Sequence, residues 1–493
     1  MSSTTLIRDL RLTRSRILIL ALVAAVAGGG WYYYRTTGPE QRLRRAREAL
    51  AQGDRHEAER WAAVLERAGY PDHARLIRGE AHLREARAAV DRAGGLERSE
   101  RAWLLFGIVC DGAAGCGSLL GAPPSVWFHN PRSLPDVAAR QALAQQRFRL
   151  EDRARAHLRE ALLELRRVQD EVLLVDRAIL AGECFVRLKE LGVPVPLREA
   201  VQLLTFAVER QPGHVEAHRW LAAIYLDLGA VRQAVTHLEA VGRLDPQDGR
   251  PYRLLGMVHR DYQKTEPAIV AYREALARQL EPHAAAEVVE ELARLLIDTG
   301  RVPEALAVLD RCPEPFARSP AVLSLRGECL WRQSRDAEAI ALVEAALREA
   351  PDLPAALLTR AKMHLERKQP HAAIPLLERA VQLDPHDHLS RHQLVEAYRL
   401  AGDHHRADEQ RRLRDETQDL KNQLTKLSTL AIQQPWDDGV RCEIARVWLR
   451  MGRPAEARVW LQAALACNPS NSYALDLLAQ LEGRRAAAER VSP

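Results

Sequence analysis

The chain has 493 residues, of which 47% are apolar and only 5% are aromatic. This length exceeds what a single compact core usually reaches, and the aliphatic composition favours helices over sheets. The formal net charge is only +5, with both signs interspersed, so the sequence lacks the basic footprint of a nucleic-acid-binding protein. The seven cysteines include no C-x-x-C pair, which argues against a zinc ribbon or a thioredoxin-like site.

The first 34 residues predict a membrane anchor. Residues 1–16 form a short basic tail, and residues 17–34 (ILILALVAAVAGGGWYYY) carry no charge. At about 1.5 Å per residue this apolar stretch would span about 27 Å, close to the thickness of a bilayer core. The aromatic residues at its end suit the headgroup level. We therefore expect a single-pass transmembrane helix, with the N-terminus cytoplasmic and the rest on the far (periplasmic or extracytoplasmic) side.

Two alternatives to the anchor remain open from the sequence. Ala25-Val26-Ala27 fits a small-residue cleavage site after an apolar run, so a signal peptide cleaved near Ala27 would give a secreted protein. The same stretch would also suit a buried core helix, because 18 residues is near the lower limit for spanning a membrane.

Residues 35–102 predict divergent helical repeats, and residues 103–136 predict an insertion. The insertion is apolar and rich in Gly and Pro, and long loops of this kind tend to be functional or disordered. Its Gly115-x-Gly117-x-x-x-Gly121 resembles a phosphate-binding loop, but no strand precedes it. Cys110 and Cys116 would form a small-loop disulfide in an oxidising compartment. The third interpretation is a loop whose aromatic residues pack back on the helices.

Residues 137–212 return to helical repeats with a stretched loop at 192–196, and residues 213–412 are regular. The stretch 215–248 sets the pattern: one amphipathic helix ends at Gly229, and a second ends near Pro246. The same order of small, large apolar and helix-ending residues returns with a period of about 34 residues. Neither helix of a pair can bury its apolar stripe alone, so each needs the next.

This recurring pattern resembles the tetratricopeptide repeat family. The residues that carry the resemblance include Leu255, Gly256, Ala268, Tyr272 and Ala275, with later copies through Ala445, Trp448, Gly452, Ala457 and Leu461. The resemblance implies an all-α fold, a right-handed superhelical α-solenoid of helix–turn–helix repeats, here preceded by the N-terminal transmembrane helix. It also implies a scaffold that binds protein or peptide partners.

Two places depart from the regular pattern. Pro375 lies inside a second helix and is expected to kink or delay it. Residues 413–434 predict an extended helix, because no proline closes the helical stretch 404–433, which would reach about 45 Å. Leu413, Leu420 and Leu427 recur at heptad spacing, which leaves open a coiled-coil seam or an arm that covers its neighbours. Residues 435–493 predict the last repeat and a capping helix.

The resemblance places chosen positions of each first helix on a concave groove. Most of the candidates are basic, which favours an extended, acidic partner peptide bound by arginine forks. The predicted partner-binding residues are Arg219, Arg250, Arg253, Arg260, Arg294, Trp331, Arg332, Lys362, Arg399, Arg446 and Arg450. An ordinary solvated face is the simpler interpretation. The alternative function is an accessory subunit of a membrane-bound secretion, envelope-assembly or glycan-synthesis complex that contacts its partner through residues 103–136.

No catalytic, cofactor or metal site is predicted. The chain has no G-x-x-x-x-G-K-[ST], H-E-x-x-H or G-x-S-x-G motif. His388 and His392 are four residues apart, a spacing that can hold a metal ion, but no carboxylate or cysteine joins them. Cys184, Cys312, Cys329, Cys442 and Cys467 are expected to be small buried apolar residues. The sequence leaves the oligomeric state open.

Overall fold

The computed structural model describes residues 38–110, 137–193 and 195–491. Their regular elements are α-helices and two short 3-10 helices, and these residues form no β-strand. The chain divides into two compact units, Met1–Val193 and Pro194–Pro493. The all-helical fold predicted from the sequence is confirmed for the described residues.

Unit 1 contains five α-helices among its described residues, each packed against the next along the chain. They are α2 (Pro39–Gln52), α3 (Arg55–Arg67), α4 (Pro71–Cys110), α5 (Val137–Arg166) and α6 (Leu174–Glu190), with a 3-10 turn, η2, at Glu171–Leu173 before α6. Asp54 starts α3, since its carboxylate accepts from the backbone N–H of Glu57 at 2.8 Å. Helix α4 covers the first residues of the predicted insertion; residues 111–136, including Cys116, lie outside the described ranges.

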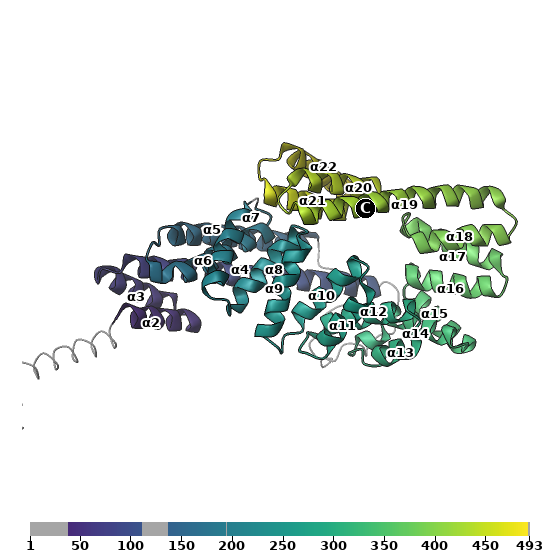
Figure 1. Cartoon of the computed structure of the whole chain (residues 1–493), viewed down its shortest axis with the longest axis horizontal. Coiled ribbons are helices and arrows are strands. Elements are labelled where there is room, and N and C mark those ends of the chain that lie inside the picture. Colours follow the sequence, from purple (N-terminus) through teal and green to yellow (C-terminus); the bar gives the residue numbers. More distant parts are fainter. Residues whose placement is uncertain (1–37, 111–136, 194, 492–493) are drawn as a thin grey trace, which may run out of the picture. The chain divides into compact units, whose positions relative to one another are not determined.

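Unit 2 is a run of paired helices (Figure 1). The bounds are α7 (Leu197–Arg210), α8 (Val215–Asp227), α9 (Val231–Leu244), α10 (Arg250–Asp261), α11 (Thr265–Leu276), α12 (Pro282–Asp298), α13 (Val302–Leu309), η3 (Phe316–Arg318), α14 (Pro320–Arg332), α15 (Asp336–Glu349), α16 (Pro354–Glu366), α17 (Pro370–Leu383), α18 (His388–Leu400), α19 (His404–Gln433), α20 (Asp438–Arg450), α21 (Pro454–Cys467) and α22 (Ser472–Val491).

Some turns between paired helices have the predicted glycine, whereas Gln263, Ser334 and Lys368 take the left-handed conformation in the others. Gly229 and Gly300 have φ values of +66° and +76°, which only glycine adopts without strain. Pro303, Pro370 and Pro454 lie in the first turns of α13, α17 and α21, where the missing N–H has no partner to lose. The prediction for Pro375 was wrong in part: α17 begins at Pro370 and continues through Pro375 to Leu383, so this proline does not delay the helix.

Small residues allow close crossings between the helices of a pair. A Cβ added at Gly256 would lie 2.4 Å from the ring of Tyr272, and one added at Gly327 would lie 2.6 Å from Val343. The buried clusters also extend across repeats, as in the cluster that joins Tyr272, Leu292, Leu309 and Leu325. Each pair therefore completes its core with residues of its neighbours, as expected for a helical-repeat array.

The long helix predicted after residue 404 is confirmed as α19, which spans His404–Gln433 (Figure 1). Its first part packs on α18 through Ala407. Its second part packs on α20, where Leu420 and Leu427 contact Val447 and Met451. These leucines are used within the chain, so α19 is an arm that covers its neighbours.

The predicted membrane localisation requires a correction. None of the helices within residues 38–110, 137–193 and 195–491 is long and apolar enough to cross a membrane. Residues 17–34, on which the predicted transmembrane helix rested, lie outside the described ranges. The single-pass localisation, with the repeats on the far side, is therefore not supported.

Candidate partner-binding surface

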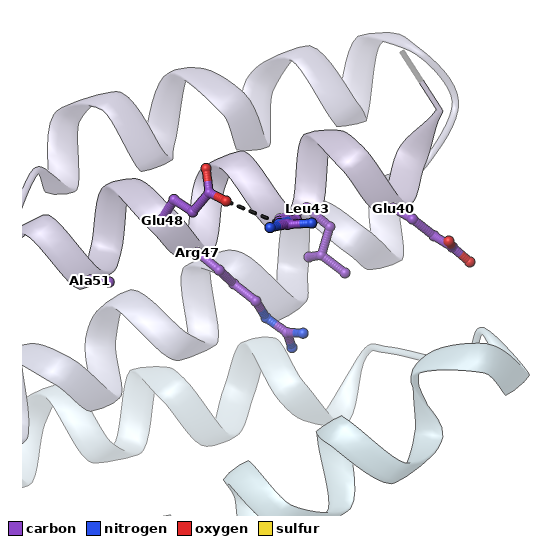
Figure 2. Close-up of a pocket in the computed structure, with 6 residues that line it drawn as sticks. Glu40, Leu43, Arg47, Glu48 and Ala51 are labelled. Carbon is purple, nitrogen blue, oxygen red and sulfur yellow. Dashed lines mark hydrogen bonds and ion pairs between the residues drawn. The ribbon is translucent and has the colours of Figure 1, made fainter. Parts of the chain in front are cut away.

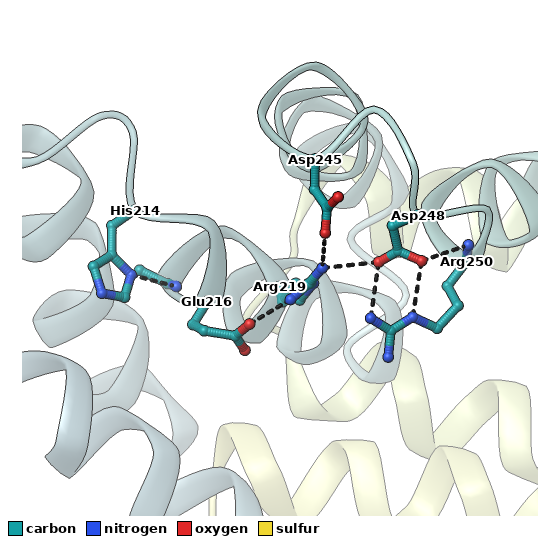
Figure 3. A network of polar contacts seen from close by, with 7 residues as sticks. His214, Glu216, Arg219, Asp245, Asp248 and Arg250 are labelled. Carbon is teal, nitrogen blue, oxygen red and sulfur yellow. Dashed lines mark hydrogen bonds and ion pairs between the residues drawn. The ribbon is translucent and has the colours of Figure 1, made fainter. Parts of the chain in front are cut away.

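The first helices of successive repeats in unit 2 carry the side chains predicted to bind a partner. Arg219 and Arg250 belong to a network at the junction of α8 and α10 (Figure 3). Arg219 Nη2 lies 2.8 Å from a carboxylate oxygen of Asp245 and of Asp248, and Arg219 also pairs with Glu216. Arg250 donates two hydrogen bonds to the carboxylate of Asp248, from Nε to Oδ1 and from Nη2 to Oδ2, both at 2.9 Å. Both guanidinium groups are thus held by acids of their own repeats.

Asp248 is the centre of this network, since its side chain is nearly buried. Burial alone would raise the pKa of Asp248, but the hydrogen bonds from Arg250 and Arg219 outweigh it and lower that pKa. The carboxylate therefore stays ionised and fixes the loop that joins α9 to α10. His214 helps to fix the preceding loop, because its Nδ1 accepts from the backbone N–H of Ala217 at 3.1 Å.

Between α10 and α12 the predicted cations pair with carboxylates of the next first helix. Arg253 Nη2 donates to Glu287 Oε2 at 2.6 Å, across 34 residues of sequence. Arg260 Nη1 lies 2.7 Å from Glu291 Oε2, and Arg294 Nη1 lies 3.8 Å from the other oxygen of Glu291. The structure therefore brings Arg253, Arg260 and Arg294 together as one polar row.

Carboxylates crowd the same stretch of α12. Burial raises the pKa of Glu290, and the neighbouring Glu291 and Glu287 raise it further, against the opposing effects of Arg294 and Ser319. The sequence-based site included the basic residues here but left these acids out. Their presence makes the row mixed in charge rather than basic.

The row continues onto α14 and α16. Trp331 Nε1 donates to Glu366 Oε2 at 2.9 Å, which links one first helix to the next across 35 residues of sequence. Arg332 pairs with Glu328 of its own helix at 3.0 Å, and Lys362 is half-buried on α16. We call the side chains of α10, α12, α14 and α16 that carry these contacts the inner row: Arg253, Arg260, Glu287, Glu291, Arg294, Trp331, Arg332 and Glu366.

The last three predicted residues are not linked to the inner row by the contacts described. Arg399 pairs with Glu396 of α18 at 3.3 Å, and Arg446 pairs with Glu443 of α20 at 2.8 Å. Arg450 Nη1 lies 3.4 Å from Gln423 of α19. Each is bound within its own helix or to α19.

Sequence reasoning missed a second polar surface, in unit 1. Helix α2 lines an open surface pocket of about 480 Å³ with Leu43, Arg47 and Ala51, and Figure 2 shows these residues together with Glu40 and Glu48. Arg47 Nη2 reaches both Glu80 of α4 and Asp176 of α6, the latter at 2.8 Å. The signal in the sequence that could have found this surface is the group of arginines at positions 42, 44, 45 and 47.

Buried carboxylates hold the arginines of this second surface. Burial raises the pKa of Glu80, against the opposing effect of Arg47. Burial also acts to raise the pKa of Glu183, but the hydrogen bonds from Arg87 and Arg187 prevail and lower it. The arginines here are therefore tied into ion pairs between helices, which suits a role in joining α2, α4 and α6.

Within the described residues, the histidines and cysteines do not form a metal-binding site. The rings of His388 and His392 stack with centroids 6.4 Å apart, and no three His, Cys, Asp or Glu side chains of the described ranges are arranged to hold an ion. Of the five cysteines whose side chains are described, Cys184, Cys312, Cys329 and Cys442 are buried as predicted, whereas Cys467 is only half-buried.

Comparison with known proteins identifies the repeats. The tetratricopeptide repeat profile matches residues 197–258 and, in overlapping stretches, residues 253–320, 292–354 and 327–388. A search of curated proteins finds no match.

Solved structures that are similar to this chain share little sequence with it. YrrB, described as a TPR protein with an unusual peptide-binding site, is 18% identical over 39% of this chain and 97% of its own, with a TM-score of 0.32. A tetratricopeptide repeat protein from Parabacteroides merdae is 16% identical over 54% of this chain and 98% of its own, with a TM-score of 0.33. PilF from Pseudomonas aeruginosa is 16% identical over 46% of this chain and all of its own, with a TM-score of 0.34.

Proposed function

Because this chain belongs to the tetratricopeptide repeat family through residues 197–388, we propose that it is a protein-interaction scaffold whose inner row binds a partner segment. Repeats of this kind generally bind other proteins rather than catalyse reactions, and stacked repeats present extended surfaces for that purpose. The observation that supports the inner row is that its side chains link neighbouring first helices: Arg253–Glu287 and Arg260–Glu291 link α10 to α12, and Trp331–Glu366 links α14 to α16.

The inner row suits an extended segment because its groups are already held in place. Each linked side chain is fixed by a partner of the neighbouring repeat, so little side-chain entropy remains to be lost on binding. Trp331 adds an aromatic face whose Nε1 is anchored, and aromatic residues with arginines are the commonest anchors of protein interfaces.

An acidic partner, as expected from the sequence, would have to compete for these arginines. Its carboxylates would replace Glu287 at Arg253 and Glu291 at Arg260, in the same bidentate-capable geometry. Half-exposed ion pairs of this kind are worth about 0–1 kcal/mol, so such an exchange is energetically accessible.

Charge reversal on the inner row tests this proposal. The triple variant Arg253→Glu, Arg260→Glu, Arg332→Glu should lose the partners that the full chain captures from native extract after mild cross-linking. A buried, charged interface pair typically contributes 2 kcal/mol or more, so about 30-fold less capture is expected.

The control reverses three other ion-paired arginines, Arg273 of α11, Arg335 before α15 and Arg379 of α17, which are more exposed than those of the inner row. This control should keep its partners. Equal loss in both triples would show that charge balance alone matters, and unchanged capture by the inner triple would refute the proposal.

A further inference from the structure

The two ends of unit 2 touch each other. Helices α7 and α21 are in contact, and Figure 1 shows them next to each other. Arg441 of α20 donates to the backbone carbonyl of Leu228, which lies 213 residues earlier in the sequence. In an open array of repeats each unit contacts only its neighbours, so a contact of this range departs from the pattern.

Arg441 is built into this contact. Its side chain is fully buried, and its Nη1 and Nη2 donate to the carbonyls of Asp437 and Pro435, each at 2.7 Å, besides that of Leu228. Taking a guanidinium out of water costs several kcal/mol unless hydrogen bonds replace the water. Leu228 follows the last residue of α8, where carbonyls lack helical partners. The carbonyl of Leu228 and Nη2 of Arg441 therefore satisfy each other, while Nε of Arg441 is buried with no hydrogen-bond partner.

Two aromatic contacts reinforce the same junction. The ring of Trp460 of α21 lies against Gly229, where an added Cβ would come within 2.8 Å of the ring. The guanidinium of Arg198 in α7 lies over the ring of Trp436, 5.2 Å from its centroid. These contacts join α21 to the turn after α8, and α7 to the loop before α20.

The preceding repeat supplies an internal comparison. Arg391 follows Pro385 by six residues, as Arg441 follows Pro435, and it too is nearly buried and donates to the carbonyl of that proline. Its other contact, to Gln410 of α19 at 2.6 Å, stays within its own repeat. Both repeats thus have a buried arginine that donates to the carbonyl of the proline six residues earlier. Of these two arginines, only Arg441 also contacts a residue at the other end of unit 2.

We propose that the repeat α20–α21 is a latch that closes unit 2 into a continuous circuit of packed helices. Consecutive helices are in contact from α7 to α21, and the contact between α21 and α7 completes the circuit. The inner row belongs to the first helices of this circuit. If the inner row binds a partner as proposed above, the partner that fits is a segment with a free end, which can be threaded, or one that enters when the latch opens.

Photo-cross-linking tests the latch without a partner. Benzoylphenylalanine in place of Trp460, in the full chain, should cross-link to residues around Gly229 and give a product at the mass of one chain. Arg441→Met should reduce the yield at least about tenfold, because it removes charged hydrogen bonds. Arg391→Met, which removes the corresponding buried arginine of the preceding repeat, should leave the yield unchanged.

A pair of glycine variants guards against simple misfolding. Gly229→Ala and Gly300→Ala carry a similar backbone strain at positive φ, but only Gly229 faces Trp460. Gly229→Ala should reduce the cross-link and Gly300→Ala should not, at equal helicity by circular dichroism. No cross-link in the parent protein, or a product at the mass of two chains, would overturn the latch. Neither result bears on the charge-reversal experiment, so the two proposals fail separately.

Discussion

At the scale of single residues, the charged side chains of the candidate surface form ion pairs whose partners could not be assigned from the sequence. The sequence correctly placed Arg253 and Arg260 on first helices, but it could not pair them with Glu287 and Glu291. The pairing depends on the offset between neighbouring helices, which the period of the repeat leaves undetermined. The resulting surface is mixed in charge, where residue counting favoured a basic one.

A second residue-scale feature is a hydrogen bond between two histidines. His218 Nδ1 lies 2.9 Å from His237 Nδ1, while His218 Nε2 lies 3.1 Å from the carbonyl oxygen of Pro212. A carbonyl only accepts, so Nε2 of His218 carries the proton, and its Nδ1 accepts from His237 in the neutral pair. Protonation at low pH would place two donors against each other.

This pair predicts a loss of stability at acid pH. Burial, and then His218, lower the pKa of His237 to about 4, whereas the unfolded value is near 6.5. The unfolded chain therefore binds the extra proton first, and the free energy of unfolding falls as pH drops from about 6.5 toward 4. Thermal melts between pH 7.5 and 4.5 should show a loss on the order of 2 kcal/mol.

His237→Gln should flatten that pH dependence, because it removes the group whose folded and unfolded pKa values differ. The exposed His371→Gln is the matched control and should leave it unchanged. An identical slope in His237→Gln and the parent protein would contradict the assignment.

At the scale of elements, small residues allow the close helix crossings, and glycines and prolines in the turns set the helix lengths. The sequence identified Gly256 as a repeat position, and the structure shows it directly against the ring of Tyr272 in the paired helix. Turn glycines and first-turn prolines set most helix bounds as expected. Pro375 did not follow the rule: it is the sixth residue of α17, and the helix continues through it to Leu383.

Gly256→Ala should destabilise unit 2 by about 1–3 kcal/mol, because the added methyl would overlap the ring of Tyr272 in a packed core. Urea denaturation followed by circular dichroism measures this change. Gly95→Ala, at a helical position with open space around it, should instead be neutral or stabilising by up to about 1 kcal/mol. Equal effects of the two substitutions would remove the argument from close packing.

The leucines of α19 give a prediction about oligomeric state as well as stability. Leu420 packs against Val447 and Met451 of the same chain, so Leu420→Ala should cost about 2–3 kcal/mol in denaturant unfolding. Leu413 is more exposed, and Leu413→Ala should have a much smaller effect. Size-exclusion chromatography with light scattering should give the same mass for both variants and the parent protein. A change in mass in Leu420→Ala would restore the coiled-coil interpretation.

At the scale of the whole chain, the repeat architecture could be predicted from residue 213 onward, because every repeat has the same order of small, large apolar and helix-ending residues. Contacts between distant repeats were not readable. The contact between Arg441 and Leu228 depends on the small rotation of each repeat relative to the next, added up over all the intervening repeats. No single residue in the sequence determines that total rotation. The membrane localisation was predicted from residues 17–34 alone, and the described helices give it no support.

A chain of repeats with two loose ends normally frays from them, since a terminal unit has a neighbour on one side only. In unit 2 the carbonyl of Leu228 and the guanidinium of Arg441 give the first and last repeats a neighbour on the other side as well. Loss of order would then start by breaking this junction or an interior one, and the whole unit would melt over a narrower range of denaturant than an open array of equal length.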